Sequence, residues 1–454
     1  MITQKVFTDE LEGRIDPNYY HPRFVSFFGK LRRGKYNLVN LSEITKTIFQ
    51  GVGKNETKDN DITLLKVKNI TQESRIDYED VEYVKGVPAS KLLETKDIIS
   101  PFIGEATRLG KFAIFDRNDN KYTVDNNTGV IRADKTKVLP EYLLTVLSSE
   151  IGKIQIERLI GGGGVPFLGA GNAKLLQIPL PTIEKQREIA LILQNALQSK
   201  KEKLKQADEL LNSIDDFVRQ QLGIDYQEPE EEKIYTVNSQ DIENNRQDPY
   251  YYKPNFVNLE KVLLENKAVK LRELIKTITN GLDYRKFSED GTMDYLRVSN
   301  IKPYKIDYTE VKKVKLSQSD IRKNIFGAKD DVLLTRKGTY GISVSLEENL
   351  SAIISSEVFL LKVYTEKINP HYLSVFFNSS LGQKQFLRNK VGAIMGSLSQ
   401  EAVRDTLIVL PSEAKQTSIV NQVRSQIRKS DELKQEAEAI VTKAKKQVEA
   451  MILN

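Results

Sequence analysis

Cationic and amide side chains gather near the expected turns in both halves of the chain, where they favour binding chemistry over covalent chemistry. Arg and Lys can hold phosphate or read guanine, whereas Asn and Gln can read adenine through a paired donor and acceptor. In the first half the candidates are Gln50, Lys54, Lys66, Lys68, Asn69, Arg108, Lys111, Asn126 and Asn127. In the second half they are Asn280, Arg285, Lys286, Arg297, Asn300, Arg336, Lys337 and Tyr340. Any one of them could be a solvated surface group, but together they fit DNA better than a neutral ligand.

Residues for covalent chemistry are scarce. The chain has no Cys, which excludes a disulfide framework, a Cys-based metal site and a Cys nucleophile. Its two His residues, His21 and His371, fall at positions that do not match between the two halves. No carboxylate pair, Ser/His/Asp set or metal-ligand cluster recurs in both halves. We therefore expect no catalytic residue, no metal and no cofactor on this chain.

Three short motifs suggest an enzyme at first sight. DPNY from Asp16 and DPYY from Asp248 resemble the loop with which amino-methyltransferases hold a flipped adenine, but both lack its second proline. FLGAG from Phe167 resembles a cofactor turn, which needs a preceding strand, a following helix and a whole nucleotide-binding domain. Gly161 to Gly164 lack the Gly-Lys-Ser/Thr ending of a phosphate loop. We interpret DPNY and DPYY as aromatic arms packed on their own domains and the two glycine-rich segments as loops. A self-contained adenine methyltransferase is the enzyme alternative.

The chain repeats itself after about half its length. DPNYYHPRF from Asp16 returns as DPYYYKPNF from Asp248, and PEYLLTVLSSEIG from Pro140 returns as PHYLSVFFNSSLG from Pro370. Solenoid repeats have periods of about 20–50 residues, so this longer period indicates a duplicated globular unit. Duplication predicts one task performed at two similar places.

The two copies keep a common frame and differ inside their loops. DIISPFIG from Asp97 matches DVLLTRKG from Asp331, yet Pro101-Phe102-Ile103 faces Thr335-Arg336-Lys337. Two DNA-binding units with one frame and unlike loops would read two different half-sites. The expected target is therefore asymmetric and bipartite.

Each copy combines a mixed part, rich in short β-type runs, with a long polar helix. We expect an α+β fold with one unit at 1–181, a helix at 182–224, a second unit at 225–411 and a second helix at 412–454. Apolar positions in the first helix step by three and four, a heptad pattern that only Lys200 interrupts. The positions are Ala190, Leu193, Leu197, Lys200, Leu204, Ala207, Leu211, Ile214 and Val218.

The second helix continues the heptad pattern with one irregularity. From Ser430 to Leu433 the step is three where four is due, a stammer that locally overwinds a coiled coil. Each helix could instead lie as an amphipathic element on its own domain, but about 40 residues span about 60 Å, more than one such domain covers. We therefore expect an antiparallel coiled coil with internal pseudo-two-fold symmetry that holds the units at a fixed separation.

Composition fits a cytoplasmic protein. The 454 residues are 39% hydrophobic and 29% charged, with no signal-peptide pattern and no run of 18 apolar residues that would cross a membrane. The net charge of +6 allows a polyanionic partner, although many proteins share such a charge.

At this point the chain resembles the specificity (S) subunits of Type I restriction-modification enzymes. IPLPTIEKQREIALIL from Ile178 is similar to the family's run into its spacer helix, and IVLPSEAKQTSIVNQV from Ile408 is a weaker second copy. The sequence departs from the family where Thr182 replaces the second Pro and where Lys185 and Lys415 replace the Glu before Gln. The ordered double occurrence covers essentially the whole chain.

The resemblance implies a non-catalytic subunit with two target-recognition domains, each docking a DNA major groove, and a helix pair that fixes the half-site spacing. Its implied partners are double-stranded DNA, two methyltransferase subunits that carry S-adenosylmethionine, and restriction subunits that use ATP and Mg. A related non-Type I restriction-modification system is an alternative. A coiled-coil scaffold with two protein-binding heads is another, and it would show no preference between DNA sequences.

Overall fold

The computed structural model describes residues 17–53, 62–71, 74–104, 109–160, 165–229, 234–242, 246–316, 326–392 and 396–454. The chain forms two compact units, of which the first comprises 1–205 together with 433–454 and the second comprises 206–432. The first unit thus takes its last segment from the C-terminal end of the chain.

The first unit is built on small sheets covered by helices. Its strands are β1 (Leu38–Asn40), β2 (Thr45–Gln50), β3 (Ile62–Leu65), β4 (Glu82–Val84), β5 (Ile98–Pro101), β6 (Ala113–Ile114), β7 (Tyr122–Val124), β8 (Thr128–Ala133) and β9 (Gln177–Pro179). Its helices are α1 (Pro22–Arg32), α2 (Pro140–Ser148), α3 (Glu150–Leu159), α4 (Gly169–Ala173) and the first part of α5 (Ile183–Leu222). The sheet orders are β2-β8-β5-β6, β4-β3-β7 and β1-β9.

The second unit repeats this plan. Its main strands are β10 (Val269–Lys270), β11 (Ile275–Asn280), β12 (Met293–Leu296), β15 (Lys312–Val314), β16 (Val332–Thr335), β17 (Ser343–Ser345), β18 (Ile353–Ile354), β19 (Val358–Val363) and β20 (Leu407–Ile408), with a short hairpin of β13 (Ile301–Lys302) and β14 (Lys305–Ile306). Its helices are α6 (Pro254–Glu265), α7 (Pro370–Asn378), α8 (Ser380–Asn389), α9 (Gln400–Arg404) and the first part of α10 (Glu413–Leu453). The orders β11-β19-β16-β17, β15-β12-β18 and β10-β20 match those of the first unit strand for strand.

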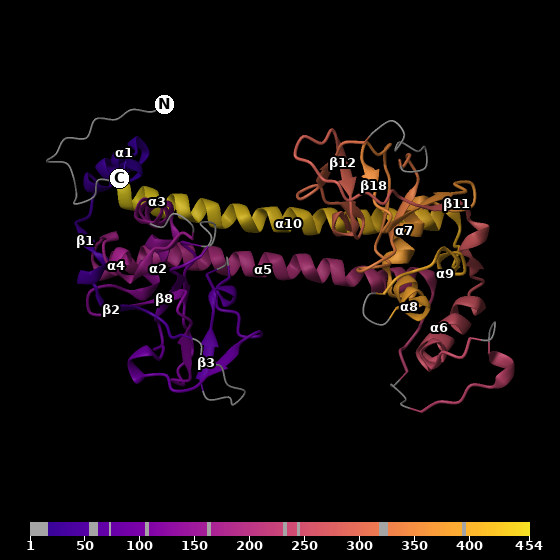
Figure 1. The fold of residues 1–454 in the computed structure, drawn as a ribbon, viewed down its shortest axis with the longest axis horizontal. Helices are drawn as coiled ribbons and strands as arrows, with labels where there is room; N and C mark the ends of the chain where they lie inside the picture. The colour runs from indigo at the N-terminus through magenta and orange to yellow at the C-terminus, as the bar shows by residue number, and fades with distance from the viewer. Residues whose placement is uncertain are drawn as a thin grey trace. The chain divides into compact units, whose positions relative to one another are not determined.

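The two long helices are each uninterrupted (Figure 1). In the first unit Lys200 and Lys203 of α5 form ion pairs with Glu438 and Glu436 of α10, at 2.7 and 2.5 Å. Residue numbers rise along one helix as they fall along the other, so the pairing is antiparallel. The predicted α+β fold and coiled coil are confirmed.

The second unit shows the same helix pairing. Gln426 Nε2 of α10 donates to Ser213 Oγ of α5 at 3.3 Å. The predicted stammer does not break α10, because Ser430 and Leu433 are both buried and the helix continues through them. The seam thus keeps its packing through the irregular step.

Each core is completed by the helix that follows the other repeat in sequence. Val448 and Ile452 of α10 pack with Phe28 and Leu31 in the core of the first unit. In the same way Ile214 and Val218 of α5 belong to the core of the second unit. The long helices are therefore part of both hydrophobic cores, and their pairing is not an appendage to the units.

The aromatic arms pack as the sequence suggests. Arg158 of α3 donates from Nε to the carbonyl of Tyr19 at 3.0 Å, and its guanidinium lies 3.7 Å from the centre of the Tyr19 ring. Arg388 of α8 does the same to Tyr251, at 2.9 and 3.9 Å. DPNY and DPYY therefore place a ring against a buried guanidinium. Asp16 itself lies outside the described residues.

The FLGAG segment differs in part from the loop expected for it. Gly169, the third residue of the segment, begins the short helix α4, and its positive φ of 68° marks the sharp turn that precedes it. Gly161 to Gly164 lie outside the described residues. Within the described ranges, no helix has the length and apolar character of a membrane span, and no three His, Cys, Asp or Glu side chains are grouped to share a metal ion.

Candidate nucleic-acid interface

A tight turn joins the two larger sheets in each unit, and we call it the central turn: 125–127 in the first unit and 355–357 in the second. The amide of Asp125 donates to the carbonyl of Leu65 at 3.0 Å, and that of Ser355 donates to Leu296 at 2.9 Å. Further bonds tie the turn to the end of the neighbouring strand. The Phe102 amide donates to the carbonyl of Asn127 at 2.8 Å. The central turn therefore collects the strand ends that carry most of the predicted contacts.

Glycine makes this crowding possible. Gly51 directly follows β2 and Gly281 directly follows β11, and at both glycines the backbone lies against that of the central turn. A Cβ atom on Gly51 would overlap the carbonyl oxygen of Val124, and one on Gly281 would overlap that of Ile354. Only glycine lets the backbones approach so closely.

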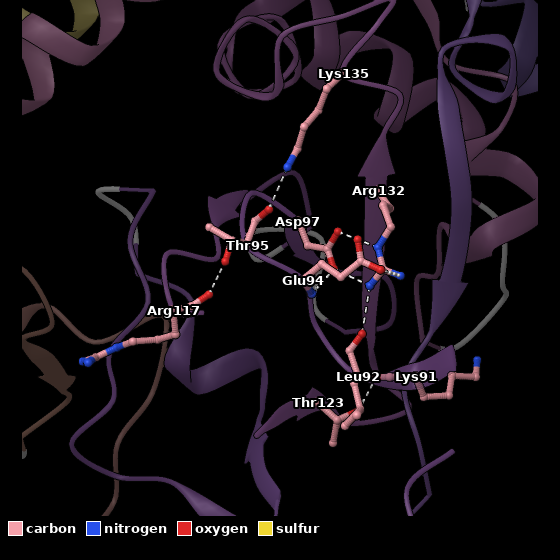
Figure 2. Close-up of polar contacts among 9 residues, drawn as sticks. All are labelled: Lys91, Leu92, Glu94, Thr95, Asp97, Arg117, Thr123, Arg132 and Lys135. Atoms are coloured by element: carbon pink, nitrogen blue, oxygen red, sulfur yellow. Dashed lines mark hydrogen bonds and ion pairs between the residues drawn. The ribbon is translucent and has the colours of Figure 1, made fainter. Parts of the chain in front are cut away.

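A buried ionic network holds the strand that leads into the variable loop of the first unit (Figure 2). Arg132 on β8 donates twice to the Asp97 carboxylate, at 2.9 and 2.7 Å, and once to the carbonyl of Leu92 at 2.8 Å. Burial raises the pKa of Asp97, and hydrogen bonds from Arg132 and from the Glu94 amide oppose that rise. The network fixes the start of β5 and so the direction of the residues after Pro101.

The second unit uses a simpler version of this network. Lys362 lies on β19 where Arg132 lies on β8, and its Nζ is 3.2 Å from the Asp331 carboxylate. Asp331 also accepts the amide of Ala328 at 2.8 Å, as Asp97 accepts that of Glu94. The frame is thus preserved, although the forked guanidinium has become an ammonium group.

The first unit neutralises its cationic candidates internally. Lys66 forms an ion pair with Glu82 and lies near enough to Asp125 to stabilise its carboxylate. Lys68 forms an exposed ion pair with Asp80 at 2.7 Å, and the hydrogen bond to Asp80 raises the pKa of Lys68. Lys111 is half-buried.

Three amide candidates serve the fold, and two of these are buried. Gln50 donates to the carbonyl of Asn126 at 3.1 Å, which ties β2 to the central turn. Asn69 and Asn300 are only 2% and 3% exposed and cap the short turns that follow β3 and β12. Each accepts a backbone amide and donates to a backbone carbonyl, as from Asn300 to Asp307 at 2.9 Å. Their expected role as direct DNA contacts does not fit this burial, because no edge of either amide faces solvent. Both are positioning residues.

The second-unit candidates are less constrained. Arg285 is 87% exposed, and Lys286 and Lys337 are exposed as well. The Asn280 side chain accepts a hydrogen bond from Gln400 at 2.9 Å, and the ring of Tyr340 lies against Gly396. Arg285 faces Asp283 at 3.5 Å, a pair that solvent screens strongly. Lys54 and Arg108 of the first unit lie outside the described residues.

Two arginines among these second-unit candidates carry a buried Nε atom that has no hydrogen-bond partner among the described residues, as Arg219 of α5 also does. They are Arg297, which follows β12, and Arg336, which follows β16. The Arg336 guanidinium lies 5.2 Å from the centre of the Phe359 ring and donates weakly, at 3.5 Å, to the carbonyl of Ser356. The buried hydroxyl of Ser355 likewise has no hydrogen-bond partner within the described ranges.

In each unit an aromatic ring fills the space beside the central turn, but the ring comes from a different one of two neighbouring strands. In the first unit the Phe102 ring covers Gly129, where any Cβ atom would overlap it. In the second unit the equivalent positions hold Arg336 and Phe359, and the ring now comes from β19. Moving the ring to the neighbouring strand leaves the loop position free to carry a guanidinium.

Register adds cationic residues that sequence inspection missed. Leu64 pairs with Glu82 across the first unit's sheet, and Tyr295 pairs with Lys312 across the second. Lys312 and its neighbour Lys313 are both exposed on the edge strand β15. The signal was present in the repeat, because KKVK stands in the second half where EYVK stands in the first.

Seven equivalent positions at and next to the central turn form what we call the turn patch. In the first unit they are Lys66, Lys68, Asp80, Glu82, Phe102, Asp125 and Asn127. In the second unit they are Arg297, Ser299, Glu310, Lys312, Arg336, Ser355 and Glu357. Two cations and three acids give the first patch a net charge of −1, whereas three cations and two acids give the second +1.

A known family matches both repeats. The Type I restriction modification DNA specificity domain matches residues 34–210 and again 264–442. The chain belongs to this family. Two specificity domains in one chain agree with the duplicated architecture and with the paired long helices.

Individual relatives agree with the family. The chain is similar to the Type I restriction enzyme EcoKI specificity subunit of Escherichia coli (strain K12), with 21% identity over 431 residues that cover 90% of this chain and 85% of that one. It is also similar to the putative type I restriction enzyme MjaX specificity subunit of Methanocaldococcus jannaschii, with 26% identity over 34% of this chain and 37% of that one. A solved structure concerned with complex assembly and conformational transition of the type I R-M system contains a similar chain. It has a TM-score of 0.50 and 16% identity, and the match covers 90% of this chain and 97% of that one.

Proposed function

We propose that this chain is the non-catalytic DNA-recognition subunit of a Type I restriction-modification complex and that each specificity domain reads one half of an asymmetric, bipartite site. One observation carries the proposal. Both units build the same hydrogen-bonded frame around the central turn, yet the polar side chains on that frame differ in charge and in shape. A duplicated frame with different contact residues suits two different half-sites better than one symmetric ligand.

Membership of the specificity family implies DNA and methyltransferase subunits as partners. We propose two methyltransferase subunits, which would carry S-adenosylmethionine, and restriction subunits, which would use ATP and Mg. Catalysis would belong to those subunits. This chain would supply recognition and the surface on which they assemble. The described part of the chain has no candidate membrane span, and a cytoplasmic complex with DNA is the proposed setting.

The experiment that tests this function is co-expression with the neighbouring methyltransferase subunit, followed by mapping of methylated adenines across a genome. The expected result is methylation at one bipartite sequence whose two halves differ. Methylation without sequence preference, or none in the presence of both subunits, would contradict the proposal. A titration of the purified chain with S-adenosylmethionine should show no binding, whereas binding would favour the self-contained methyltransferase.

Helix length offers a second test. Inserting one heptad into both α5 and α10 keeps the buried seam in phase and adds about 10 Å of helix. At 3.4 Å per base pair this corresponds to about three base pairs. The mapped gap between half-sites should lengthen accordingly, and a variant complex that still methylates the original site would show that the helices do not set the gap.

A further inference from the structure

We propose that Arg297 and Arg336 of the second unit form a donor site for acceptor groups of DNA and that the equivalent place in the first unit is closed by its own acids. The inference deepens the proposed function and rests on it. The ligand chemistry is a hydrogen-bond acceptor, which DNA offers both as the O6 and N7 edge of guanine and as phosphate oxygen.

Both arginines reach the same turn. Arg297 directly follows Leu296, whose carbonyl accepts the Ser355 amide at 2.9 Å. Arg336 donates through its backbone amide to the carbonyl of Glu357 at 2.9 Å and through its guanidinium to Ser356. The backbone at or next to each arginine is thus tied to the central turn, and the Arg336 guanidinium is also bonded to it.

Their hydrogen bonding is incomplete as folded. The Nε atoms of Arg297 and Arg336 and the Oγ of Ser355 are all buried, and none has a hydrogen-bond partner in the part of the chain that the structure describes. Buried polar groups without a partner are uncommon in folded proteins and call for an explanation. A guanidinium that makes no Nε bond loses none when it turns toward DNA, so these side chains gain more by binding than fully paired ones would.

The neighbouring strand decides whether the site is open. Lys66 of the first unit and Arg297 of the second occupy the same extended position after β3 and β12. In the first unit the diagonal neighbour across the sheet is Glu82, which pairs with Lys66. In the second unit that neighbour is Lys312, which has the same charge as Arg297 and cannot form an ion pair with it. The carboxylate of Asp125 is likewise replaced by the neutral Ser355.

Acids remain nearby, but they do not close the site. Glu310 lies on the turn before β15, and Glu357 is exposed on the central turn. Among the described residues, neither forms an ion pair with Arg297 or Arg336. The ring of Phe359 supports one face of the Arg336 guanidinium, which keeps its planar fork oriented for a bidentate acceptor.

The test uses the full chain assembled with its methyltransferase subunits and two fluorescent duplexes, one with the mapped site and one with a scrambled sequence. Arg297→Ala and Arg336→Ala should each weaken binding to the site about 5- to 150-fold, the range for a bidentate contact. A loss confined to one base position identifies a guanine edge. An equal loss on both duplexes, together with a slope of log binding constant against log salt concentration that is shallower by about one, identifies a contact to phosphate. No loss with either variant on either duplex overturns the site.

Two charge reversals on β15 give a matched control. Lys312→Glu places an acid beside Arg297, as Glu82 lies beside Lys66, whereas Lys313→Glu changes the net charge equally on the opposite face of the strand. Both side chains are exposed, so both variants should fold. Lys312→Glu should bind the site at least about fivefold more weakly than Lys313→Glu. Equal binding by the two variants would show that the face of β15 that carries Lys312 has no role at the donor site.

The same data separate the inference from the function on which it rests. If the wild-type complex does not prefer the mapped duplex over the scrambled one, the proposed function fails. If it keeps that preference and all four variants match it, only the donor site fails. Arg336→Lys, which retains charge and the aliphatic stem, should lose a guanine contact but keep most of a phosphate contact.

Discussion

Phe102 packs over Gly129 in the first unit, and Arg336 packs over Phe359 in the second. The same space beside the central turn is filled by a ring in both units, but the ring belongs to the loop in one case and to the adjacent strand in the other. Because the strand supplies the volume in the second unit, its loop position can carry a charged group without leaving a cavity. The frame therefore permits a change of recognition chemistry through a paired exchange across two strands.

The two units also differ in the ion pair that holds the strand leading into this loop. Arg132 and Asp97 of the first unit are nearly buried and bonded at two points, whereas Lys362 of the second is 41% exposed and bonded at one. Both carboxylates are buried, Asp97 at 2% and Asp331 at 6% exposure, but only Asp97 has a partner that is itself shielded from water. The two units thus share topology but distribute their stability differently.

The largest expected effect comes from removing the ring of the second unit. Phe359→Gly deletes a buried side chain on a central strand, and we expect a loss of about 4–5 kcal/mol, the sum of the usual Phe→Ala loss and the strand cost of glycine. Adding Arg336→Phe should recover much of that loss by restoring the arrangement of the first unit. Hydrogen exchange of the β16 and β19 amides measures both variants. A double variant no better protected than the single one would show that the exchange is not a paired one.

The ionic networks should differ nearly as much. Arg132→Ala leaves the Asp97 carboxylate buried without its partner, which should cost about 3–5 kcal/mol in the opening of β8. Lys362→Ala removes one contact that solvent partly screens, and the buried Asp331 keeps its bond from the Ala328 amide, so the cost in β19 should be smaller, about 1–3 kcal/mol. The control is Lys135→Ala, whose Nζ makes one exposed hydrogen bond to the carbonyl of Thr95 at 3.3 Å. Equal losses at Arg132 and Lys362 would mean that burial of the cation does not separate the two networks.

Charge exchange in the first unit should have a moderate effect on DNA binding. Glu82→Lys installs the residue of the second unit and releases Lys66 from its ion pair. The plot of log binding constant against log salt concentration should become steeper, by the amount expected for about one to two additional phosphate contacts. Tyr83→Lys is the matched control, because it adds a cation on the other face of β4. An unchanged slope with Glu82→Lys would show that this face of the first unit does not meet DNA.

Much of this architecture can be predicted from the internal sequence repeat and from the heptad spacing of apolar residues. The duplicated motifs predict two similar units. The heptad steps predict two long helices with buried seams, and the structure buries Ala190 and Val218 of α5 and Val420 and Val423 of α10. The aromatic arms were recognisable because a paired-ring motif recurs in both halves, although the buried guanidinium of Arg158 against which one arm packs was not foreseen.

Other features depend on the register between strands and on which unit each long helix packs against, and the period of a sequence pattern specifies neither. That Glu82 pairs with Lys66, and that Lys312 takes the place of Glu82 in the second unit, follows only from which residues of two strands stand opposite each other. The amide of Asn69 suits adenine and so predicts a DNA contact, yet a short turn after β3 directs this amide inward. The exchange of helices between the two cores was equally hidden, since a seam shows that a helix is buried but not against which unit.

The smallest expected difference between the units is in their response to pH. His371 at the start of α7 stands where the first unit has Glu141, which pairs with Lys96 at 2.9 Å. Burial lowers the pKa of His371, and the nearby Arg424 adds to that effect, while its Nδ1 lies 2.5 Å from the hydroxyl of Ser345.

The lowered pKa sets the sign of this pH dependence. A folded-state pKa below the unfolded value of about 6.5 means that unfolding takes up a proton at mildly acidic pH. The stability of the second unit should therefore be highest above about pH 7 and fall as the pH drops through that value. His371→Gln should remove this fall. Hydrogen exchange of β16 and β19 between neutral and mildly acidic pH measures the change, with the first-unit strands β5 and β8 as internal reference. If the variant loses stability with acid as steeply as the wild type, the pH dependence arises elsewhere in the unit.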